Sequence, residues 1–574
     1  MKRGCLVSLG ALLVLLVVTA GVVIYAVAKV SAPSVERGSF VEIRVGGAIP
    51  ENIAESALLG DDPMTMRDFS DVLRWAADDS RVQGIVLVIE PLGVGWAKIE
   101  ELRDEIEAAK AKGKTVVAFL EEGDDPEYYL ATAADKIFMP PMGFLSVDGL
   151  NVEMSFYRGT LDKVGVYYDG VHVGKFKSAP EHYSRTGMSD PAREEYTALV
   201  DGLYQTYIAG VATARKIPKE KVVALVDGGP YTATAAKDKG LIDDCFYWDE
   251  FETWVKGTSS KKPQIVEAEK VRAMAASAHA PSALGGSEVA VVYATGEIMP
   301  GESSSGGLTS GATMGSDTIV EALKEARDDD NVKAVVLRID SPGGSVIASD
   351  IIWRAVQITK AKKPVIVSMS DLAASGGYYI AMGASAIVAQ PDTLTGSIGI
   401  FTGKFVTKDL YGKAGISNDQ VKRGQYADMF TSSRNFTDDE RKKIEKDLAD
   451  SYDVFISKVA EGRGMDKKKV DDIAQGRVWL GESGKKIGLV DELGGLEKAI
   501  DVAKQKAGLA GDPAIVVLPR KRSIFDRLRD GKGLVEEKTT LPGPLGRAFE
   551  DVQHAAALPE KEPMMLMPET IRIR

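Results

Sequence analysis

The sequence has few of the residues that build covalent cross-links and metal sites. Its 574 residues include two cysteines, Cys5 and Cys245, which are too few for a disulfide framework or a metal cluster. We therefore predict no metal and no cofactor. Histidine is also scarce, with four residues in the whole chain. The formal net charge is −12 and no broad basic run occurs, which argues against nucleic acid as a partner.

One long apolar run stands at the N-terminus. Lys2 and Arg3 precede 25 uncharged residues, 4–28, which is long enough to cross a bilayer core of about 30 Å. The basic residues in front favour a cytoplasmic N-terminus, so we predict a single transmembrane anchor with the rest of the chain exported. Ala26-Val27-Ala28 also fits the small-residue pattern of a cleavage site, so a cleaved signal peptide is the alternative.

One segment of the chain occurs twice, at an offset of 250 residues. "EEGDDPEYYLATAADKI" at 121–137 aligns with "DLAASGGYYIAMGASAI" at 371–387, and the stretch 76–93 aligns without a gap with 326–343. The match persists over about 200 residues, a period far longer than that of a solenoid repeat. We interpret it as an internal duplication.

Each copy alternates two kinds of segment. Short apolar runs such as "GIVLVIE", "TVVAFL", "AVVLRID" and "PVIVSMS" predict buried parallel strands. Amphipathic stretches such as "IEELRDEIEAAKAKG" and "SDIIWRAVQITKAKK" predict helices between them. The pattern predicts two tandem α/β domains at 40–256 and 288–510, joined by a linker at 257–287 and followed by a loosely packed tail at 511–574.

Ser375 distinguishes the two copies. It follows a predicted strand and precedes Gly376 and Gly377, whereas the N-terminal copy has Asp125 and two larger residues at the same places. A serine at the start of a helix can act as a nucleophile, with the amide of Gly376 facing an oxyanion. The nearby loop "IDSPGGS" offers further amides, and the N-terminal copy lacks its paired glycines. Each feature alone is also typical of an ordinary helix cap or turn.

A nucleophilic serine needs a base. The C-terminal copy that holds Ser375 contains none of the four histidines, which are His172, His182, His279 and His554. A buried lysine is the other candidate, because burial lowers the pKa of an amine. Lys177, in "VGKFKSAPE", has Ala427 at the matching place in the other copy. The two copies would then share one dyad between them, with His172 and His182 as alternative bases.

Four motifs in order, "GKFKSA", "SPGGS", "AASGGYYIA" and "TLTGSIGI", resemble the signal peptide peptidase A family in its long, duplicated, membrane-anchored form. The resemblance covers roughly 40–510 and implies a crotonase-like fold related to the Clp protease. It implies a serine endopeptidase with Ser375 as nucleophile and Lys177 as base. The oxyanion amides would be those of Gly376 and Gly344, and Ser397 would help to hold the lysine.

The resemblance also implies an oligomeric state, a location and a substrate class. It implies a homotetramer at the inner (cytoplasmic) membrane, with its catalytic domains on the periplasmic side, that degrades cleaved signal peptides and other apolar peptides. The long tail after residue 511 departs from the family pattern. Two other functions stay open at this point: a crotonase-like enzyme acting on acyl-CoA, and a non-catalytic membrane scaffold.

Overall fold

The computed structural model describes residues 35–53, 62–258, 263–277, 286–304, 312–520 and 563–567. The apolar segment 4–28, predicted as an anchor, lies outside these residues. Among the helices that are described, none is both long enough and apolar enough to cross a membrane.

The N-terminal half is built, within the described residues, on a six-stranded parallel sheet in the order β10-β1-β2-β3-β5-β9. Its strands are β1 (Ser39–Gly47), β2 (Val82–Leu92), β3 (Thr115–Leu120), β5 (Lys136–Met139), β9 (Asp244–Cys245) and β10 (Ile265–Glu267). A small side sheet contains β4 (Glu122–Asp124), β6 (Phe144–Ser146) and β8 (Tyr231–Thr232). The helices are α2 (Met66–Asp78), α3 (Trp96–Ala111), α4 (Asp125–Ala131), α5 (Arg158–Val164), α6 (Glu181–Ser184), α7 (Asp190–Arg215), α8 (Lys219–Val226), α9 (Ala233–Asp238), α10 (Trp248–Gly257) and α11 (Ala268–Ser277).

The C-terminal half repeats this plan. Its main sheet contains β11 (Glu288–Thr295), β14 (Val332–Ser341), β16 (Val365–Ala374), β17 (Ala386–Ala389), β18 (Leu394–Gly396), β20 (Val478–Leu480), β21 (Glu492–Leu493) and β22 (Ala514–Leu518). The helices are α12 (Ser316–Asp328), α13 (Val346–Lys360), α14 (Gly376–Ala381), α15 (Lys408–Lys413), α16 (Asp438–Arg463), α17 (Lys467–Ile473), α18 (Gly481–Ile487) and α19 (Leu496–Lys506). The run β22-β11-β14-β16-β17-β21 matches the N-terminal sheet strand for strand.

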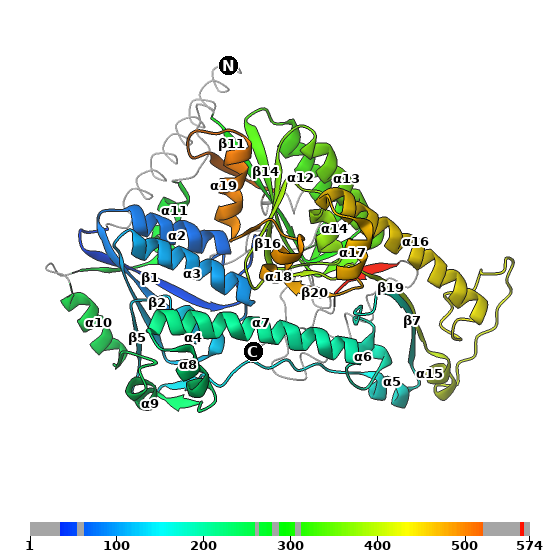
Figure 1. The fold of residues 1–574 in the computed structure, drawn as a ribbon, viewed down its shortest axis with the longest axis horizontal. Coiled ribbons are helices and arrows are strands. Elements are labelled where there is room, and N and C mark those ends of the chain that lie inside the picture. The colour runs from blue at the N-terminus through cyan, green and yellow to red at the C-terminus, as the bar shows by residue number, and fades with distance from the viewer. Residues whose placement is uncertain are drawn as a thin grey trace, which may run out of the picture.

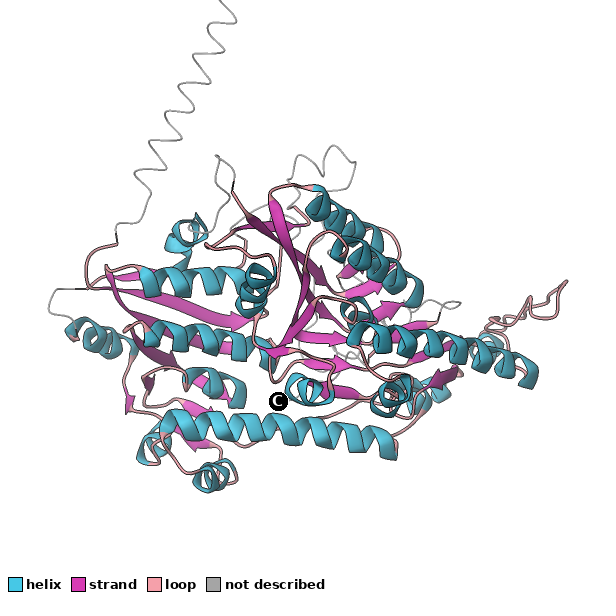
Figure 2. Cartoon of the chain, turned by 45° about the horizontal axis from the view of Figure 1, so that its top comes forward, coloured by secondary structure: helices cyan, strands magenta, loops and turns pink. Residues whose placement is uncertain are grey.

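The predicted α/β class and the duplication are therefore confirmed. The apolar runs singled out in the sequence form β2, β3, β14 and β16, and the two amphipathic stretches form α3 and α13. The central strands are apolar on both faces because helices cover both sides of each sheet, and Figure 2 shows strands in the interior with helices along the outside.

The predicted linker and tail need correction. Residues 263–277, inside the stretch 257–287 predicted as a linker, form β10 and α11; β10 extends the N-terminal sheet beside β1. Residues 514–518, predicted to belong to a loosely packed tail, form β22, which pairs with β11 in the same way. Each copy thus has, near its end, an edge strand that was too short and too isolated in sequence for periodicity to reveal.

A third sheet joins the two halves. Its order is β13-β12-β15-β23-β19-β7, with β7 (Tyr167–Val173), β12 (Glu297–Met299), β13 (Thr313–Gly315), β15 (Gly343–Ser345), β19 (Ile400–Val406) and β23 (Met564–Leu566). β7 belongs to the N-terminal copy and runs antiparallel to β19 of the C-terminal copy, from Val173 opposite Ile400 to Tyr167 opposite Val406. Figure 1 shows these two strands side by side. Because of this pairing, the residues that follow β7 lie against the C-terminal half.

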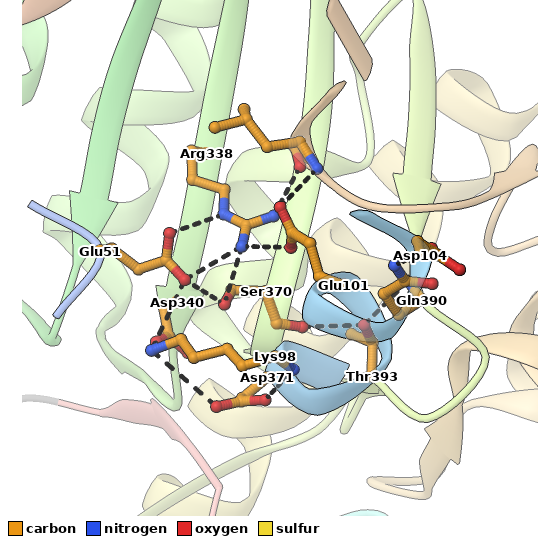
Figure 3. Close-up of polar contacts among 12 residues, drawn as sticks. Glu51, Lys98, Glu101, Asp104, Arg338, Asp340, Ser370, Asp371, Gln390 and Thr393 are labelled. Carbon is orange, nitrogen blue, oxygen red and sulfur yellow. Dashed lines mark hydrogen bonds and ion pairs between the residues drawn. The ribbon is translucent and has the colours of Figure 1, made fainter. Parts of the chain in front are cut away.

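Buried charges also fasten the halves together (Figure 3). Arg338 on β14 is fully buried and donates to both carboxylate oxygens of Glu51, at 2.9 and 3.0 Å, and to Glu101 at 2.8 Å. Lys98 on α3 donates to Asp340 at 2.9 Å. Burial opposes ionisation, but Arg338 and Lys98 hold the pKa of Glu51 at about 2, so this carboxylate stays charged near neutral pH. Acids of one half thus neutralise the arginine of the other.

Removing the arginine should therefore leave two acids buried without their partner. We expect Arg338→Ala to lower the free energy of unfolding by about 3–5 kcal/mol in urea denaturation. Lys468→Ala is the control, because Lys468 pairs with Asp472 on the surface with 82% of its side chain exposed, and should change stability by less than about 0.5 kcal/mol. Equal effects of the two substitutions would contradict this role for Arg338.

Candidate active site

Ser375 lies between β16 and α14 in a strained backbone conformation. Its φ is 55° and its ψ is −111°, a region that costs a non-glycine residue about 1–3 kcal/mol. The surroundings hold it there: its N–H donates to Gly396 O at 2.7 Å, and its carbonyl accepts the N–H of Tyr379 at 2.8 Å. The following Gly376 has no room for a side chain, because an added Cβ would lie 2.6 Å from Ser349 Oγ. The turn presents the Ser375 hydroxyl at the end of the sheet.

Lys177 meets this hydroxyl from the other half of the chain. Its Nζ lies 2.7 Å from Ser375 Oγ, 3.0 Å from Ser397 Oγ and 3.1 Å from Ser397 O. Lys177, Ser375 and Ser397 are all buried, with exposed fractions of 1% or less. The sequence comparison singled out these three residues from separate motifs, and the fold brings them into contact within one chain.

The loop that carries Lys177 is fixed by contacts with the C-terminal half. The N–H of Phe176 donates to Gln475 O at 2.7 Å. Gly476 packs against the backbone of Lys177 so closely that an added Cβ would lie 2.5 Å from the backbone nitrogen of Lys177. Ser397, which contacts the amine, also has a positive φ of 50° and donates its N–H to Arg477 O at 2.7 Å. The backbone of 475–477 therefore holds both the lysine loop and Ser397.

Burial sets the charge of the amine. It lowers the pKa of Lys177 to about 7, against the opposing attraction of Glu195 on α7. Burial also raises the pKa of Glu195 to about 8, although this carboxyl accepts the N–H of Val478 at 2.9 Å. Near neutral pH a large share of Glu195 is thus protonated and attracts the ammonium ion weakly. The site favours a neutral amine, which can accept a proton.

The glycines of the "SPGGS" loop lie beside the serine. Gly343 and Gly344 have φ values of 106° and 151°, which favour glycine. A Cβ added to Gly343 would lie 2.7 Å from the amide nitrogen of Gly376, and a Cβ added to Gly376 would lie 3.1 Å from the amide nitrogen of Gly344. The amide nitrogens of Gly376 and Gly344, which were predicted to bind an oxyanion, therefore lie close to each other beside Ser375.

The alternative bases contact other groups. His172 Nδ1 lies 3.1 Å from Gly174 O, and His182 Nδ1 lies 2.7 Å from Ser155 O. His279 and His554 fall outside the described residues. Lys175, two residues before Lys177, has more than half of its side chain exposed and pairs with Glu194 on the surface. Among the bases that the sequence offered, Lys177 is the one placed against Ser375 in the described structure.

Sequence reasoning missed the residues that support the lysine. Glu195, Gln475 and Gly476 have no motif around them, and each acts through a contact between the two copies. Of these three residues, only Gly476 could have been suspected from the sequence, because an isolated glycine can indicate a place where another backbone comes close.

Known proteins resemble this chain over most of its length. The Peptidase family S49 model matches residues 108–273 and 357–510, one segment in each half, and the Clp protease model matches 311–393. The serine protease SPPA, chloroplastic, of Arabidopsis thaliana is 34% identical over 534 residues, covering 89% of this chain and 78% of that protein. Protease 4 of Salmonella typhi is 33% identical over 476 residues, covering 81% and 74%.

A solved structure is also similar. A ClpP1 mutant from Listeria monocytogenes is 16% identical, with a TM-score of 0.24, and the match covers 36% of this chain and 93% of that one. The family assignment rests on the sequence matches, which span more than half of this chain and about three quarters of its relatives. The chain belongs to peptidase family S49, and it is a serine peptidase.

Proposed function

We propose that this peptidase is a membrane-anchored endopeptidase with a Ser375/Lys177 dyad. One observation carries the assignment: a fully buried amine lies 2.7 Å from the hydroxyl of a serine held in a strained turn. A lysine in such a place satisfies both demands on a base, which are reach and a pKa near neutrality.

The contacts of Lys177 suit a neutral amine. A neutral –NH₂ has two protons and one lone pair, and three oxygen atoms surround Nζ. The two protons are donated to the Ser397 hydroxyl and carbonyl oxygens, which leaves the lone pair to accept the Ser375 proton. In this role Ser397 orients the base.

The reaction then follows from the geometry. Ser375 Oγ attacks the substrate carbonyl carbon while Lys177 takes its proton. The amides of Gly376 and Gly344 stabilise the oxyanion of the tetrahedral intermediate. Lys177 returns the proton to the leaving amine, and water then hydrolyses the acyl-enzyme by the same steps.

Other features of the chain support a proposal for the substrate and the location. A putative signal peptide peptidase SppA of Enterococcus faecium is 36% identical over 188 residues, covering 33% of this chain. With the apolar run 4–28 as an anchor, the enzyme would act on signal peptides and other apolar peptides at the inner membrane, on its periplasmic side. Two crotonase-like domains and a homotetramer complete the proposal, which involves no cofactor and no nucleic acid.

Ser375→Ala should abolish cleavage of casein and of a signal peptide while the protein stays folded. Loss of one hydroxyl at a helix start costs at most about 1–2 kcal/mol. Peptide cleavage measured by mass spectrometry, together with a thermal melt, tests both parts. Cleavage at the wild-type rate would show that another residue is the nucleophile.

The second test concerns the base. Because Lys177 must lose its proton to work and its pKa is about 7, kcat/KM should rise with pH through a limb near 7. Lys177→Arg should be as inactive as Lys177→Ala, since a guanidinium stays protonated. Lys175→Ala is the matched control and should keep most of the activity, because Lys175 is an exposed neighbour. An active Lys177→Arg enzyme would assign the base to another group.

The anchor has its own test. The full chain should stay with membranes after a carbonate wash, and a chain starting at Ser34 should be soluble. Sequencing the N-terminus of the mature protein distinguishes a retained anchor at 4–28 from a cleaved signal peptide. A mature chain beginning at Lys29 would mean that this segment is a cleaved signal peptide.

A further inference from the structure

A buried acid on α7 contacts strand β20 next to the candidate active site. Glu195 is 1% exposed, and its Oε2 accepts the N–H of Val478 at 2.9 Å. Glu195 belongs to the N-terminal copy, whereas Val478 begins β20 of the C-terminal copy. Figure 1 shows α7 passing close to β20. This hydrogen bond therefore ties one half of the chain to the other.

The segment that ends at Val478 holds both sides of the dyad. On the serine side, Val478 pairs with Gly396 in the ladder of β18 and β20, and Gly396 O accepts the N–H of Ser375 at 2.7 Å. On the lysine side, Gln475 O accepts the N–H of Phe176, the residue before the lysine, at 2.7 Å. A side chain that fixes Val478 therefore acts on the nucleophile and on the base at once.

The carboxyl group of Glu195 is held in an environment that favours its neutral form. Its second oxygen, Oε1, is buried and accepts no hydrogen bond within the described residues. Lys177, Arg477 and Glu181 act on the carboxyl group electrostatically, and Tyr196 is its titratable neighbour on α7. Burial outweighs the attraction of the two cations and raises the pKa of Glu195 to about 8.

The matching helix of the other copy has a lysine at this place. α7 and α16 both follow a hydroxyl N-cap, Ser189 and Thr437, and both contain 26 residues. Counted from these caps, Lys443 stands at the place of Glu195. Lys443 is 42% exposed and pairs with Asp447 on the surface. Of these two helices, the one with the buried acid therefore belongs to the copy that carries the proposed base.

We propose that Glu195 is a positioning residue for the Ser375/Lys177 dyad: it aligns the two side chains through the backbone of 475–478 and keeps a neutral carboxyl group near the amine. The inference rests on the proposed dyad mechanism. A neutral carboxyl group still accepts the N–H of Val478. An ionised carboxylate would attract the ammonium ion, raise the pKa of Lys177 and reduce the share of free amine.

Steady-state kinetics on a synthetic signal peptide across a range of pH tests this role. Glu195→Gln keeps an acceptor for the N–H of Val478 and removes the attraction that favours the ammonium ion. The rising limb of kcat/KM should therefore move to lower pH, while kcat on the plateau is largely kept. Glu195→Ala leaves the buried N–H without its acceptor, so kcat on the plateau should fall about tenfold with little change in KM.

Glu194→Gln is the matched control. Glu194 is the preceding residue, is 51% exposed and pairs with Lys175 and Arg477, so its loss of charge should leave the limb and the plateau unchanged. A thermal melt shows whether each variant is folded. If Glu195→Ala does not fold, the limb and plateau of Glu195→Gln decide alone.

The dyad variants separate this inference from the proposed function. With Ser375→Ala and Lys177→Ala inactive, an unshifted limb in Glu195→Gln, or a wild-type plateau in a folded Glu195→Ala, would overturn the role of Glu195 and leave the dyad standing. A plateau as low in Glu195→Gln as in Glu195→Ala would also overturn it, since the charge would then be required. Activity in Lys177→Ala would overturn the proposed function itself.

Discussion

Burial lowers the pKa of the Lys177 amine to about 7, and contacts between the two halves of the chain maintain this burial. Lys177 comes from the N-terminal copy, yet the groups that surround its amine, Ser375 and Ser397, come from the C-terminal copy. A gap between the halves would admit water and restore the amine to its ordinary pKa of about 10.4. The β7–β19 pairing and the buried contacts of Arg338 close that gap.

Burial of the Lys177 amine lowers the stability of the folded chain. The unfolded chain binds a proton at Lys177 up to its ordinary pKa, whereas the folded chain releases this proton near pH 7. Between these two values the unfolded state binds more protons, so the contribution of Lys177 to stability is unfavourable at neutral pH and improves as pH rises. The strained backbone of Ser375 adds a second local cost. Both are tolerated because the sheets and cores around them are extensive and apolar.

The two copies differ at the places of the proposed nucleophile. In the N-terminal copy Asp125 stands at the place of Ser375, and its carboxylate accepts the amides of Asp148 and Gly149. Glu127, at the place of Gly377, accepts the N–H of Leu92 at 2.6 Å, in the loop that corresponds to "SPGGS". In the N-terminal copy, carboxylates thus bind loop amides at the places where the other copy has Ser375 and Gly377.

The sequence was informative wherever the two copies could be compared. Ser375 and Lys177 were found because each has a different residue at the matching place, and the strands were found because their apolar runs are continuous. Contacts between the two copies produce no comparable pattern in the sequence. Neither the β7–β19 register nor the carboxyl of Glu195 could be predicted, since both depend on how two folded halves meet. The position of β23 could not be predicted either, because a strand of three residues is too short to show a periodic pattern.

The position of β23 between β15 and β19 limits which peptides could lie in its place. A peptide between β15 and β19 must be extended, because both of its edges face sheet strands. A segment inside a folded domain already has its backbone paired, and it would have to unfold before it could enter. The buried surroundings of Met565 further disfavour charged side chains, whose desolvation would go uncompensated. Under the proposed function, these two conditions would favour peptides that are unfolded and apolar.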